Sequence, residues 1–188
     1  MKIDNTFYNA GIDEAGRGPI FGPLSVSLVI LPNGFKDKRI IDSKKLNFQK
    51  REELFKLITK NAIYYKNIFI SNKEIDNENI NTLTRNAIIE LYNEASKKYS
   101  IKNLYIDYIK VPEIECSHSE SKAEDKYIEV AAASIISKVL RDRYILSLDS
   151  KYDKYGIKTN FGYLTRKHKE AIEKHGLSDL HRKKYRIK

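Results

Sequence analysis

The sequence predicts a single α/β domain over residues 1–188, in which helices flank a mixed β-sheet and a further helical segment stands at the C-terminal end. Two strand-like runs lie close together near the N-terminus, and helical and strand-like patterns then alternate along the chain. Neither an internal repeat nor a Pro/Gly-rich linker divides the sequence. A length of 188 residues suits one domain with a sizeable core.

The first two strands are predicted over residues 8–13 and 24–31, and the second run is rich in Val, Ile and Leu. The turn-forming sequence GPIFGP, which ends at Pro23, separates them. This short connection favours an antiparallel hairpin, because a parallel pair needs a crossover of about a dozen residues or more.

Helical and strand-like patterns alternate in the rest of the chain. Asn47 is suited to cap a helix that runs to about residue 60. Runs dense in Ile, Tyr and Phe predict strands over residues 63–71 and 101–109. Apolar residues recur at helical spacing over residues 80–95 and 123–148. A last helix is expected to start after Thr165 and to stop at Gly176, since glycine readily adopts the left-handed conformation that ends a helix.

The chain is basic, with 35 Lys and Arg against 25 Asp and Glu and a formal net charge of +10. Residues 165–188 hold nine Lys and Arg and three Asp and Glu, and they supply +6 of that excess. A genome that overuses lysine would also raise the charge, but it would not gather the charge at one end. The clustering favours a polyanionic partner, and we expect residues 165–188 to contribute to binding it.

The cysteine content and the hydropathy pattern indicate the cellular location that we expect for the protein. Cys116 is the only cysteine, so the chain forms no internal disulfide, as in a reducing cytosol. The N-terminal residues lack the long apolar core of a signal peptide, and no run approaches the roughly 18 apolar residues of a membrane span. We expect a cytoplasmic monomer without a membrane partner.

Three carboxylates follow apolar strands. Asp13 and Glu14 come at the end of the first strand, just before Gly16, and Asp107 lies toward the end of a later strand. Each alone could be a turn residue or an ion-pair partner. Consecutive strand residues point to opposite faces, so Asp13 and Glu14 serve one site only where the strand ends or the site wraps its edge. If the two strands are neighbours, Asp13 and Asp107 could meet, and their oxygen ligands suit Mg²⁺ or Mn²⁺.

Three further acidic residues lie within the long helical pattern. Glu124 stands three residues after Ser121, a spacing that fits a capping box, although an anion at this position could also bind metal. Asp125 is its immediate competitor for that role. Asp142 is interpreted most simply as a helix-surface partner of Arg141 or Arg143.

Several segments resemble the type 2 ribonuclease H family (ribonuclease HII). They occur in the family's order and span nearly the whole chain: GIDEAGRGPIFGPL at 11–24, DSKKL at 42–46, LYID at 104–107, KAEDKYIEVAAASIISKVLRDR at 122–143, FGYLT at 161–165 with His168, and His181-Arg182. The resemblance implies a ribonuclease H-like fold. It also implies an endoribonuclease that cuts RNA paired with DNA, including isolated ribonucleotides in duplex DNA, and so acts in DNA replication and repair.

The resemblance assigns roles to individual residues. It implies that Asp13, Glu14, Asp107 and Glu124, with Asp125 as the alternative, hold two divalent cations (Mg²⁺ or Mn²⁺) and that cleavage leaves 5′-phosphate and 3′-hydroxyl ends. Other residues would contact the nucleic acid. Gly16, Arg17 and Gly18 would read the ribose, Tyr163 would stack on the following sugar, and Lys44, Lys45 and Arg17 would contact phosphates.

The chain departs from the family pattern at two positions. Glu124 stands where the family usually has Asp, and Tyr108 follows Asp107 where many members have Gly. Glu124 and the IIS of AAASIIS resemble the sister type 3 enzymes, so a type 3-like specificity for RNA runs is one alternative. The other is a basic nucleic-acid-binding module without catalysis, which the intact set of acidic residues disfavours.

Overall fold

The computed structural model describes residues 6–186 and shows a five-stranded mixed sheet in the order β3-β2-β1-β4-β5. The strands are β1 (Phe7–Ala15), β2 (Leu24–Ile30), β3 (Tyr64–Ile70), β4 (Ser100–Asp107) and β5 (Ser117–Glu120). The predicted hairpin is confirmed, because β1 and β2 pair antiparallel, as do β2 and β3. β4 lies parallel to β1 and to β5, so the carboxyl ends of β1 and β4 meet at one edge of the sheet.

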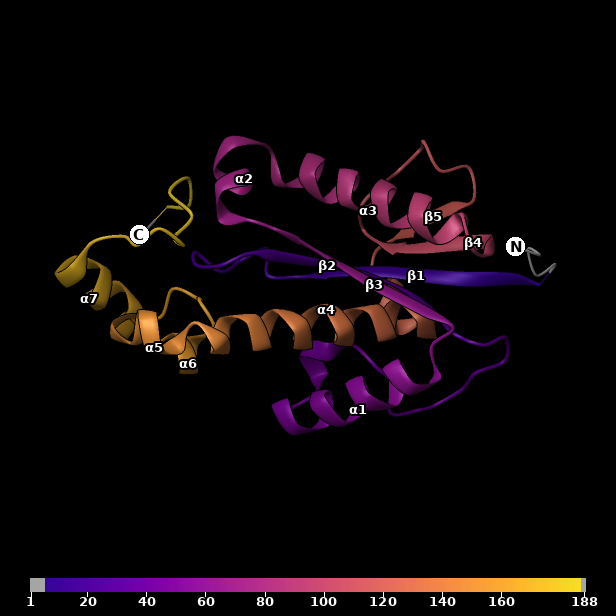
Figure 1. The fold of residues 1–188 in the computed structure, drawn as a ribbon, viewed down its shortest axis with the longest axis horizontal. Helices are drawn as coiled ribbons and strands as arrows, with labels where there is room; N and C mark the ends of the chain where they lie inside the picture. Colours follow the sequence, from indigo (N-terminus) through magenta and orange to yellow (C-terminus); the bar gives the residue numbers. More distant parts are fainter. Residues whose placement is uncertain (1–5, 187–188) are drawn as a thin grey trace.

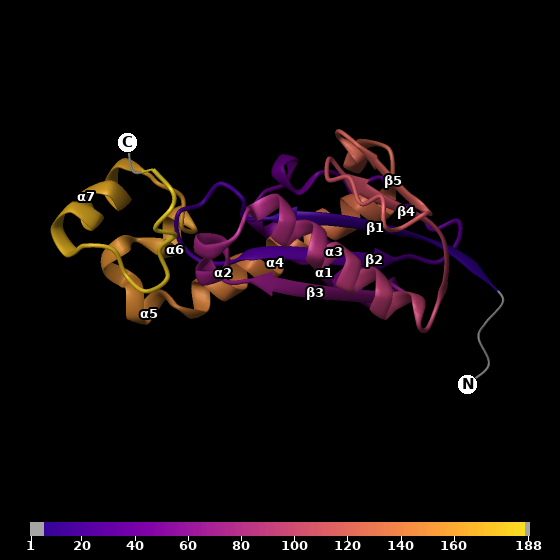
Figure 2. The same ribbon diagram turned by 90° about the horizontal axis from the view of Figure 1, so that it is seen from above.

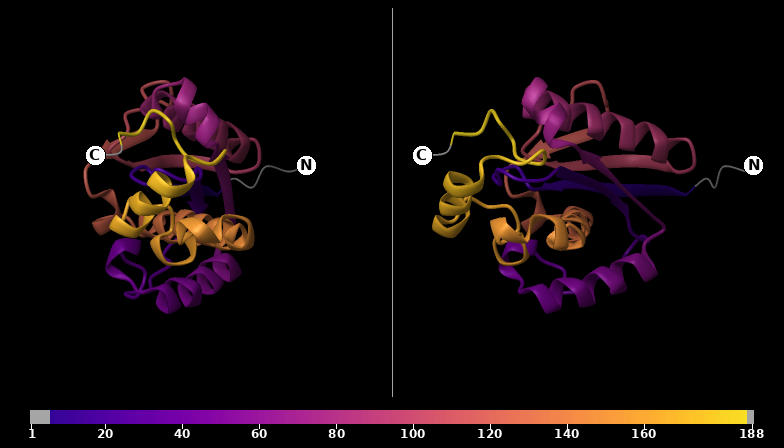
Figure 3. Two further views of the ribbon diagram at one scale, coloured as in Figure 1. Left: turned by 90° about the vertical axis from the view of Figure 1, so that its left-hand side faces the viewer. Right: turned by 60° about the vertical axis from the view of Figure 1, so that its left-hand side comes forward.

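Helices cover both faces of the sheet. On one face lie α2 (Asn72–Asn77) and α3 (Ile80–Ser96), and on the other lies α4 (Ile128–Ser147), with α1 (Phe48–Asn61) packed outside it (Figures 1 and 3). Three short 3-10 helices, η1 (Ser43–Lys45), η2 (Ala123–Asp125) and η3 (Asp153–Tyr155), lie in the connections. The α/β architecture with a mixed, helix-flanked sheet is confirmed.

Small residues allow α4 to approach the sheet closely. The alanines of α4 are buried against β2 and α1, and a Cβ atom at Gly11 would lie 2.2 Å from the backbone carbonyl carbon of Glu129. Only glycine fits that approach. As a result α4 lies along β1, and the segment before α4 is held beside the ends of β1 and β4.

The C-terminal helices form a layer beyond one end of the sheet (Figure 2). They are α5 (Asp149–Tyr152), α6 (Ile157–Asn160) and α7 (Arg166–His175). The chain then returns to the turn after β1, where the Gly22 N–H donates to the Leu180 carbonyl at 2.9 Å and the Arg182 N–H donates to the Ile20 carbonyl at 2.7 Å. The basic C-terminal tail, residues 182–188, is described as far as residue 186, and residues 187 and 188 lie outside the described part of the chain.

The predicted helix ends are partly right. The Asn47 side chain caps α1 by accepting the Lys50 N–H at 2.9 Å, and α7 ends at Gly176, which has a φ of +73°. The predicted start of the long helix near residue 123 is wrong, because η2 intervenes and α4 begins at Ile128. Within the described residues, no helix is both long and apolar enough to cross a membrane.

Candidate active site

Carboxylates gather where β1 and β4 end. The register pairs Ile12 with Ile106, so the next residues, Asp13 and Asp107, emerge side by side. Asp13 is buried, with 6% of its surface exposed, and its Oδ1 accepts the Glu14 N–H at 2.7 Å. Asp107 Oδ1 accepts the Ala123 N–H at 3.3 Å, which ties η2 to the end of β4.

Burial and repulsion by neighbouring carboxylates raise the pKa values of Asp13, Glu14 and Glu124. Burial raises the pKa of Asp13 well above its ordinary value, and the charges of Glu14 and Asp107 add to the rise. Burial also raises the pKa of Glu14 to about 7; Arg17 opposes this rise and Asp107 adds to it. Burial, with smaller contributions from Asp107 and Asp42, raises the pKa of Glu124. These carboxylates therefore share one electrostatic environment that disfavours their charged forms.

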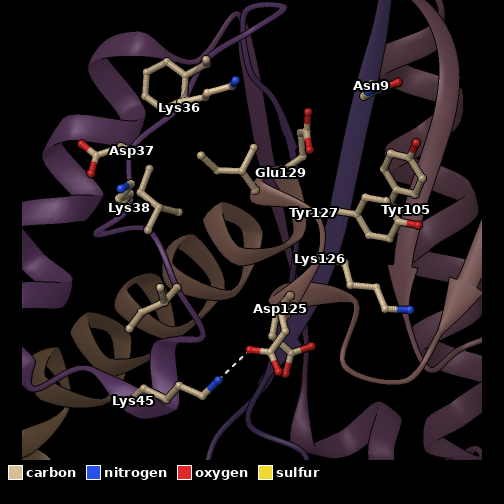
Figure 4. Close-up of a pocket in the computed structure, with 15 residues that line it drawn as sticks. Asn9, Lys36, Asp37, Lys38, Lys45, Tyr105, Asp125, Lys126, Tyr127 and Glu129 are labelled. Carbon is tan, nitrogen blue, oxygen red and sulfur yellow. Dashed lines mark hydrogen bonds and ion pairs between the residues drawn. The ribbon is translucent and has the colours of Figure 1, made fainter.

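Glu124 and Asp125 differ in their surroundings. The Oε2 atom of Glu124 is buried and accepts no hydrogen bond from the described residues. Asp125 is instead an ion-pair partner of Lys45, with Nζ 2.6 Å from Oδ1, and its side chain is 45% exposed (Figure 4). The capping box expected between Ser121 and Glu124 is absent, because η2 has no side-chain cap and Lys122 before it adopts a φ of +60°.

A cavity of about 720 Å³ opens between the 35–45 segment and the start of α4; it reaches Glu124 and Asp125, but Asp13, Glu14 and Asp107 do not line it (Figure 4). Lys36, Lys38 and Lys45 line one side, and Glu124 and Glu129 line the other. Within residues 6–186, no three His, Cys, Asp or Glu side chains are grouped closely enough to hold a metal ion as they stand. The carboxylates therefore interact through their charges rather than as a preformed set of ligands.

Lys44 faces the acidic residues from η1. Burial lowers its pKa, but the charges of the nearby carboxylates, Asp42 and Asp13 first and then Glu124 and Asp107, together outweigh burial and raise the pKa above its ordinary value. Asp42 also caps η1, since its Oδ1 accepts the Lys44 N–H at 2.9 Å. Lys44 is thus held beside the carboxylates, whereas Lys45 points to Asp125.

A buried network anchors this segment to α4. Arg51 of α1 donates to the carbonyls of Ser43 and Leu46, and its Nη2 lies 3.6 Å from Asp142 Oδ2. Asp142 is 1% exposed and also accepts from Lys138 Nζ at 2.7 Å. The expected pairing of Asp142 with a neighbouring arginine on the helix surface is therefore wrong: its partners are one turn earlier in α4 and in α1.

The glycine-flanked turn after β1 lies against Tyr163. Gly16 has a φ of +101°, which glycine adopts without strain. A Cβ atom at Gly18 would lie 3.7 Å from Cε1 of Tyr163, whose surface is 47% exposed. Between the glycines, Arg17 donates to Asn81 and to Thr84 Oγ1, and it lies 3.6 Å from Glu14 Oε1. The structure thus brings the turn, Tyr163 and the acidic residues to one end of β1.

Sequence reasoning missed two buried arginines beneath this turn. Arg141 donates to the carbonyls of Pro23, Phe21 and Phe161 at 3.0–3.1 Å. Arg182 donates to the carbonyls of Gly22 at 2.9 Å and Arg17 at 3.1 Å. Their only sequence signals are the LRDR and HR motifs, which do not reveal backbone partners.

Two buried histidines fix the loop that carries Tyr163. His168 Nδ1 lies 2.9 Å from the Tyr163 carbonyl, which only accepts, so this nitrogen carries the proton. His181 Nδ1 accepts the Ser178 N–H at 2.9 Å, which leaves its Nε2–H to donate to His168 Nε2 at 3.1 Å. Both rings are therefore neutral in this arrangement.

A mixed sheet with acidic residues at the ends of adjacent parallel strands, next to a basic glycine-flanked turn, is typical of nucleases that use metal ions. Within this class the chain belongs to the ribonuclease HII family, because the family model for ribonuclease HII matches residues 10–188. The chain is accordingly a ribonuclease H-type endonuclease of a family that acts on nucleic acid and depends on divalent metal.

Individual relatives agree with this assignment. Ribonuclease HII of Clostridioides difficile (strain 630) is 41% identical over 95% of this chain and 69% of its own length. Ribonuclease HII of Bacillus cereus (strain G9842) is 41% identical over 98% of this chain and 71% of its own length.

Solved structures show the same fold. The ribonuclease HII in the PCNA:RNase HII complex from Archaeoglobus fulgidus superposes with a TM-score of 0.81 at 29% identity, over 96% of both chains. Ribonuclease H2 from Pyrococcus horikoshii OT3 superposes with a TM-score of 0.80 at 28% identity, over 95% of this chain and 93% of that chain. Bst-RNase HIII, solved with Mn²⁺, shares the fold at 19% identity and a TM-score of 0.70, over 90% of this chain and 63% of that chain.

Proposed function

We propose that this chain hydrolyses the RNA strand of RNA/DNA hybrids and incises duplex DNA on the 5′ side of single embedded ribonucleotides, leaving 5′-phosphate and 3′-hydroxyl ends. The observation that carries the proposal is the group of buried, mutually repelling carboxylates beside the Gly16–Gly18 turn and Tyr163. We further propose that residues 1–188 act as one cytoplasmic, monomeric catalytic domain whose basic segment 165–188 contributes to substrate binding.

The carboxylates suit divalent cations by their chemistry. The ligand atoms that they offer are all oxygens, which Mg²⁺ and Mn²⁺ prefer. The buried Oε2 of Glu124 has no hydrogen-bond partner among the described residues. Positive charge would also relieve the repulsion that raises the pKa values of Asp13 and Glu14. In the proposal, Asp13, Glu14, Asp107 and Glu124 hold two cations. The ion pair with Lys45 supports Glu124 over Asp125 as the fourth ligand.

Two divalent cations, when bound, would supply an activated water and stabilise the leaving 3′ oxygen. The chain's own residues would orient the substrate. Lys44 and Lys45 would contact phosphates beside the carboxylates, since Lys44 already lies within reach of their charges. Arg17 would contact a phosphate from the opposite side of the site, next to Glu14.

The turn and Tyr163 would recognise the ribose. The 2′-hydroxyl is the group that distinguishes RNA from DNA. At Gly18 no side chain separates the backbone from Tyr163. At Gly16 the missing side chain leaves room for the buried Arg141 beneath the turn, so backbone groups of the turn can approach the sugar. The half-exposed ring of Tyr163 beside Gly18 would stack on the next sugar. This arrangement supports incision at a single ribonucleotide, which offers only one 2′-hydroxyl.

The test is cleavage of a labelled DNA duplex that contains one ribonucleotide, with Mg²⁺, with Mn²⁺ and with a chelator, beside Asp13→Asn. We expect metal-dependent incision on the 5′ side of the ribonucleotide that the variant loses. Cutting of a long RNA/DNA hybrid without incision at the single ribonucleotide would instead assign type 3-like specificity. If neither substrate is cut, the chain is a binding module and the proposal is wrong.

A further inference from the structure

The turn directly after β4 holds a strained residue. Tyr108 has a φ of +63°, a left-handed conformation that is unfavourable for an aromatic residue. The backbone imposes this conformation, because the Tyr108 N–H donates to the Glu120 carbonyl at 3.1 Å and the next N–H, of Ile109, donates to the Asp107 carbonyl at 2.7 Å. A glycine would adopt the same turn without strain.

Contacts within the protein do not compensate this strain. The surface of Tyr108 is 70% exposed, and neither its ring nor its hydroxyl has a ring contact or hydrogen-bond partner within residues 6–186. Phe161 also has a positive φ, of +48°, but Arg141 binds its carbonyl and Lys138 Nζ lies 5.4 Å from the centre of its ring. A strained residue that faces solvent next to a site is typical of a ligand contact.

Tyr108 lines a separate groove of about 570 Å³, which is connected to the candidate active site through its neighbours in the chain and in hydrogen bonding. Asp107 precedes Tyr108 in the chain, and Arg17 of the glycine-flanked turn donates to Asn81, which also lines the groove. The other lining groups are mostly polar, and Lys110 has no ion-pair partner within the described residues. Amide donors, a cation and an exposed aromatic ring together match a sugar–phosphate backbone.

We propose that Tyr108, Asn81 and Lys110 form a flanking subsite for the polynucleotide substrate. The Tyr108 ring packs on a sugar outside the reacting nucleotide, because the bases of a duplex are already paired and stacked. Lys110 and Asn81 contact the adjacent phosphate. This inference rests on the proposed function and adds a contact outside the acidic residues, the glycine-flanked turn and Tyr163.

The test compares Tyr108→Gly with Tyr108→Phe in an Asp13→Asn background. Binding to a labelled DNA duplex with one ribonucleotide is measured by fluorescence anisotropy without divalent cation. We expect Tyr108→Gly to weaken binding about fivefold to tenfold, near the lower end of what aromatic stacking contributes in other nucleic-acid sites. Tyr108→Phe keeps the ring, so its affinity should stay within about twofold of the parent.

Controls separate a contact from a change in folding. Thermal unfolding should show Tyr108→Gly at least as stable as the parent, since the glycine removes the strain. Phe7→Ala, which truncates another exposed aromatic residue at the opposite end of the sheet, should leave binding unchanged. Lys110→Ala should reduce the slope of log Kd against log salt concentration by about one.

Three results would contradict the proposed subsite. They are unchanged affinity in Tyr108→Gly, equal weakening in Tyr108→Phe, and an unchanged salt slope in Lys110→Ala. Cleavage by the wild-type protein, measured in parallel, keeps the two proposals apart. If the wild type cleaves but these variants bind like the parent, only the subsite fails. If the wild type neither cleaves nor binds the duplex, both fail.

Discussion

Buried charges on the two sides of the turn after β1 are compensated in opposite ways. Beneath the turn, Arg141 and Arg182 lie buried without a carboxylate hydrogen-bond partner and donate chiefly to backbone carbonyls, although Nη2 of Arg182 has no hydrogen-bond partner among the described residues. At the strand ends, the acidic residues face one another and accept few hydrogen bonds, chiefly the N–H groups of Glu14 and Ala123. The arginines thus make several hydrogen bonds to the fold, whereas the acidic residues accept few and repel one another.

The difference separates a scaffold from a binding site. Carbonyl oxygens of a fixed turn can solvate a guanidinium group without a counter-ion, although burial and the charge of Arg182 lower the pKa of Arg141 to about 10. Carboxylates in the same protein would need N–H donors or cations, and the folded chain supplies too few. The arginines therefore fix the turn in place, whereas the carboxylates are available to bind cations from solution.

The largest expected effect is on catalysis at the acidic residues. Asp13→Asn should reduce cleavage on the order of a thousand-fold, because it removes a charge that the cations require. Without metal, the same variant should be more stable by about 1 kcal/mol, since it removes a buried and repelled charge. Activity assays and urea unfolding with a chelator measure the two effects. A variant that is less stable than the wild type would show that the carboxylate is structural.

On the arginine side, substitution should act on stability first. Arg182→Met should lower the free energy of unfolding by about 3 kcal/mol, because it removes the Arg182 donor to the Gly22 carbonyl and one of the two donors to the Arg17 carbonyl. Arg166→Met is the matched control, since Arg166 is exposed and only pairs with Glu170 on the surface of α7. Urea unfolding should show a change below about 0.5 kcal/mol for the control. Equal effects in both variants would contradict the scaffold role.

The histidine pair should make this side of the molecule sensitive to acid. Burial, with the neighbouring His168, lowers the pKa of His181 to about 4, whereas in the unfolded chain it should lie near 6.5. A lowered histidine pKa means that the unfolded chain binds the proton more readily, so stability is complete above pH 6.5 and declines as the pH falls toward 4. We expect a loss of about 1–3 kcal/mol across that range.

Urea unfolding at several pH values measures this loss. His181→Gln removes the titrating ring, so its stability should change less between pH 6.5 and 4 than that of the wild type. His175→Gln is the control, because His175 is exposed at the end of α7. An equal decline in the wild type and His181→Gln would assign the acid sensitivity to other groups.

The sequence predicts the parts of this molecule that depend on local patterns. The hairpin, the Asn47 cap and the acidic strand ends follow from apolar periodicity, capping chemistry and turn residues. β5 was not predicted, because SHSE has no apolar pattern and becomes a strand only by pairing with β4. The arginine–carbonyl contacts were not predicted either, since backbone partners leave no trace in residue identity.

The errors at Glu124 and Asp142 have physical causes. The spacing from Ser121 to Glu124 fits a capping box, but the left-handed Lys122 turns the chain before a helix can start. Asp142 was assigned to its neighbours in sequence, whereas its partner Arg51 lies on another helix. In the first case the local backbone overrides the sequence spacing, and in the second a tertiary contact replaces the partner that the sequence favours.

The smallest predicted effect tests how closely the scaffold controls the turn. The Tyr185 hydroxyl donates to the Arg17 carbonyl at 2.6 Å, and Arg182 donates to the same hydroxyl at 3.1 Å. Tyr185→Phe should cost about 1 kcal/mol of stability, the net value of one hydrogen bond. Tyr64→Phe is the matched control, because the Tyr64 hydroxyl donates to Glu94 of α3, and it should cost a similar amount.

If the buried arginines and Tyr185 position the turn, only Tyr185→Phe should also reduce the ratio of affinities for duplexes with and without a ribonucleotide, measured in Asp13→Asn. Equal ratios in the two variants would show that the hydrogen bond stabilises the fold without positioning the turn.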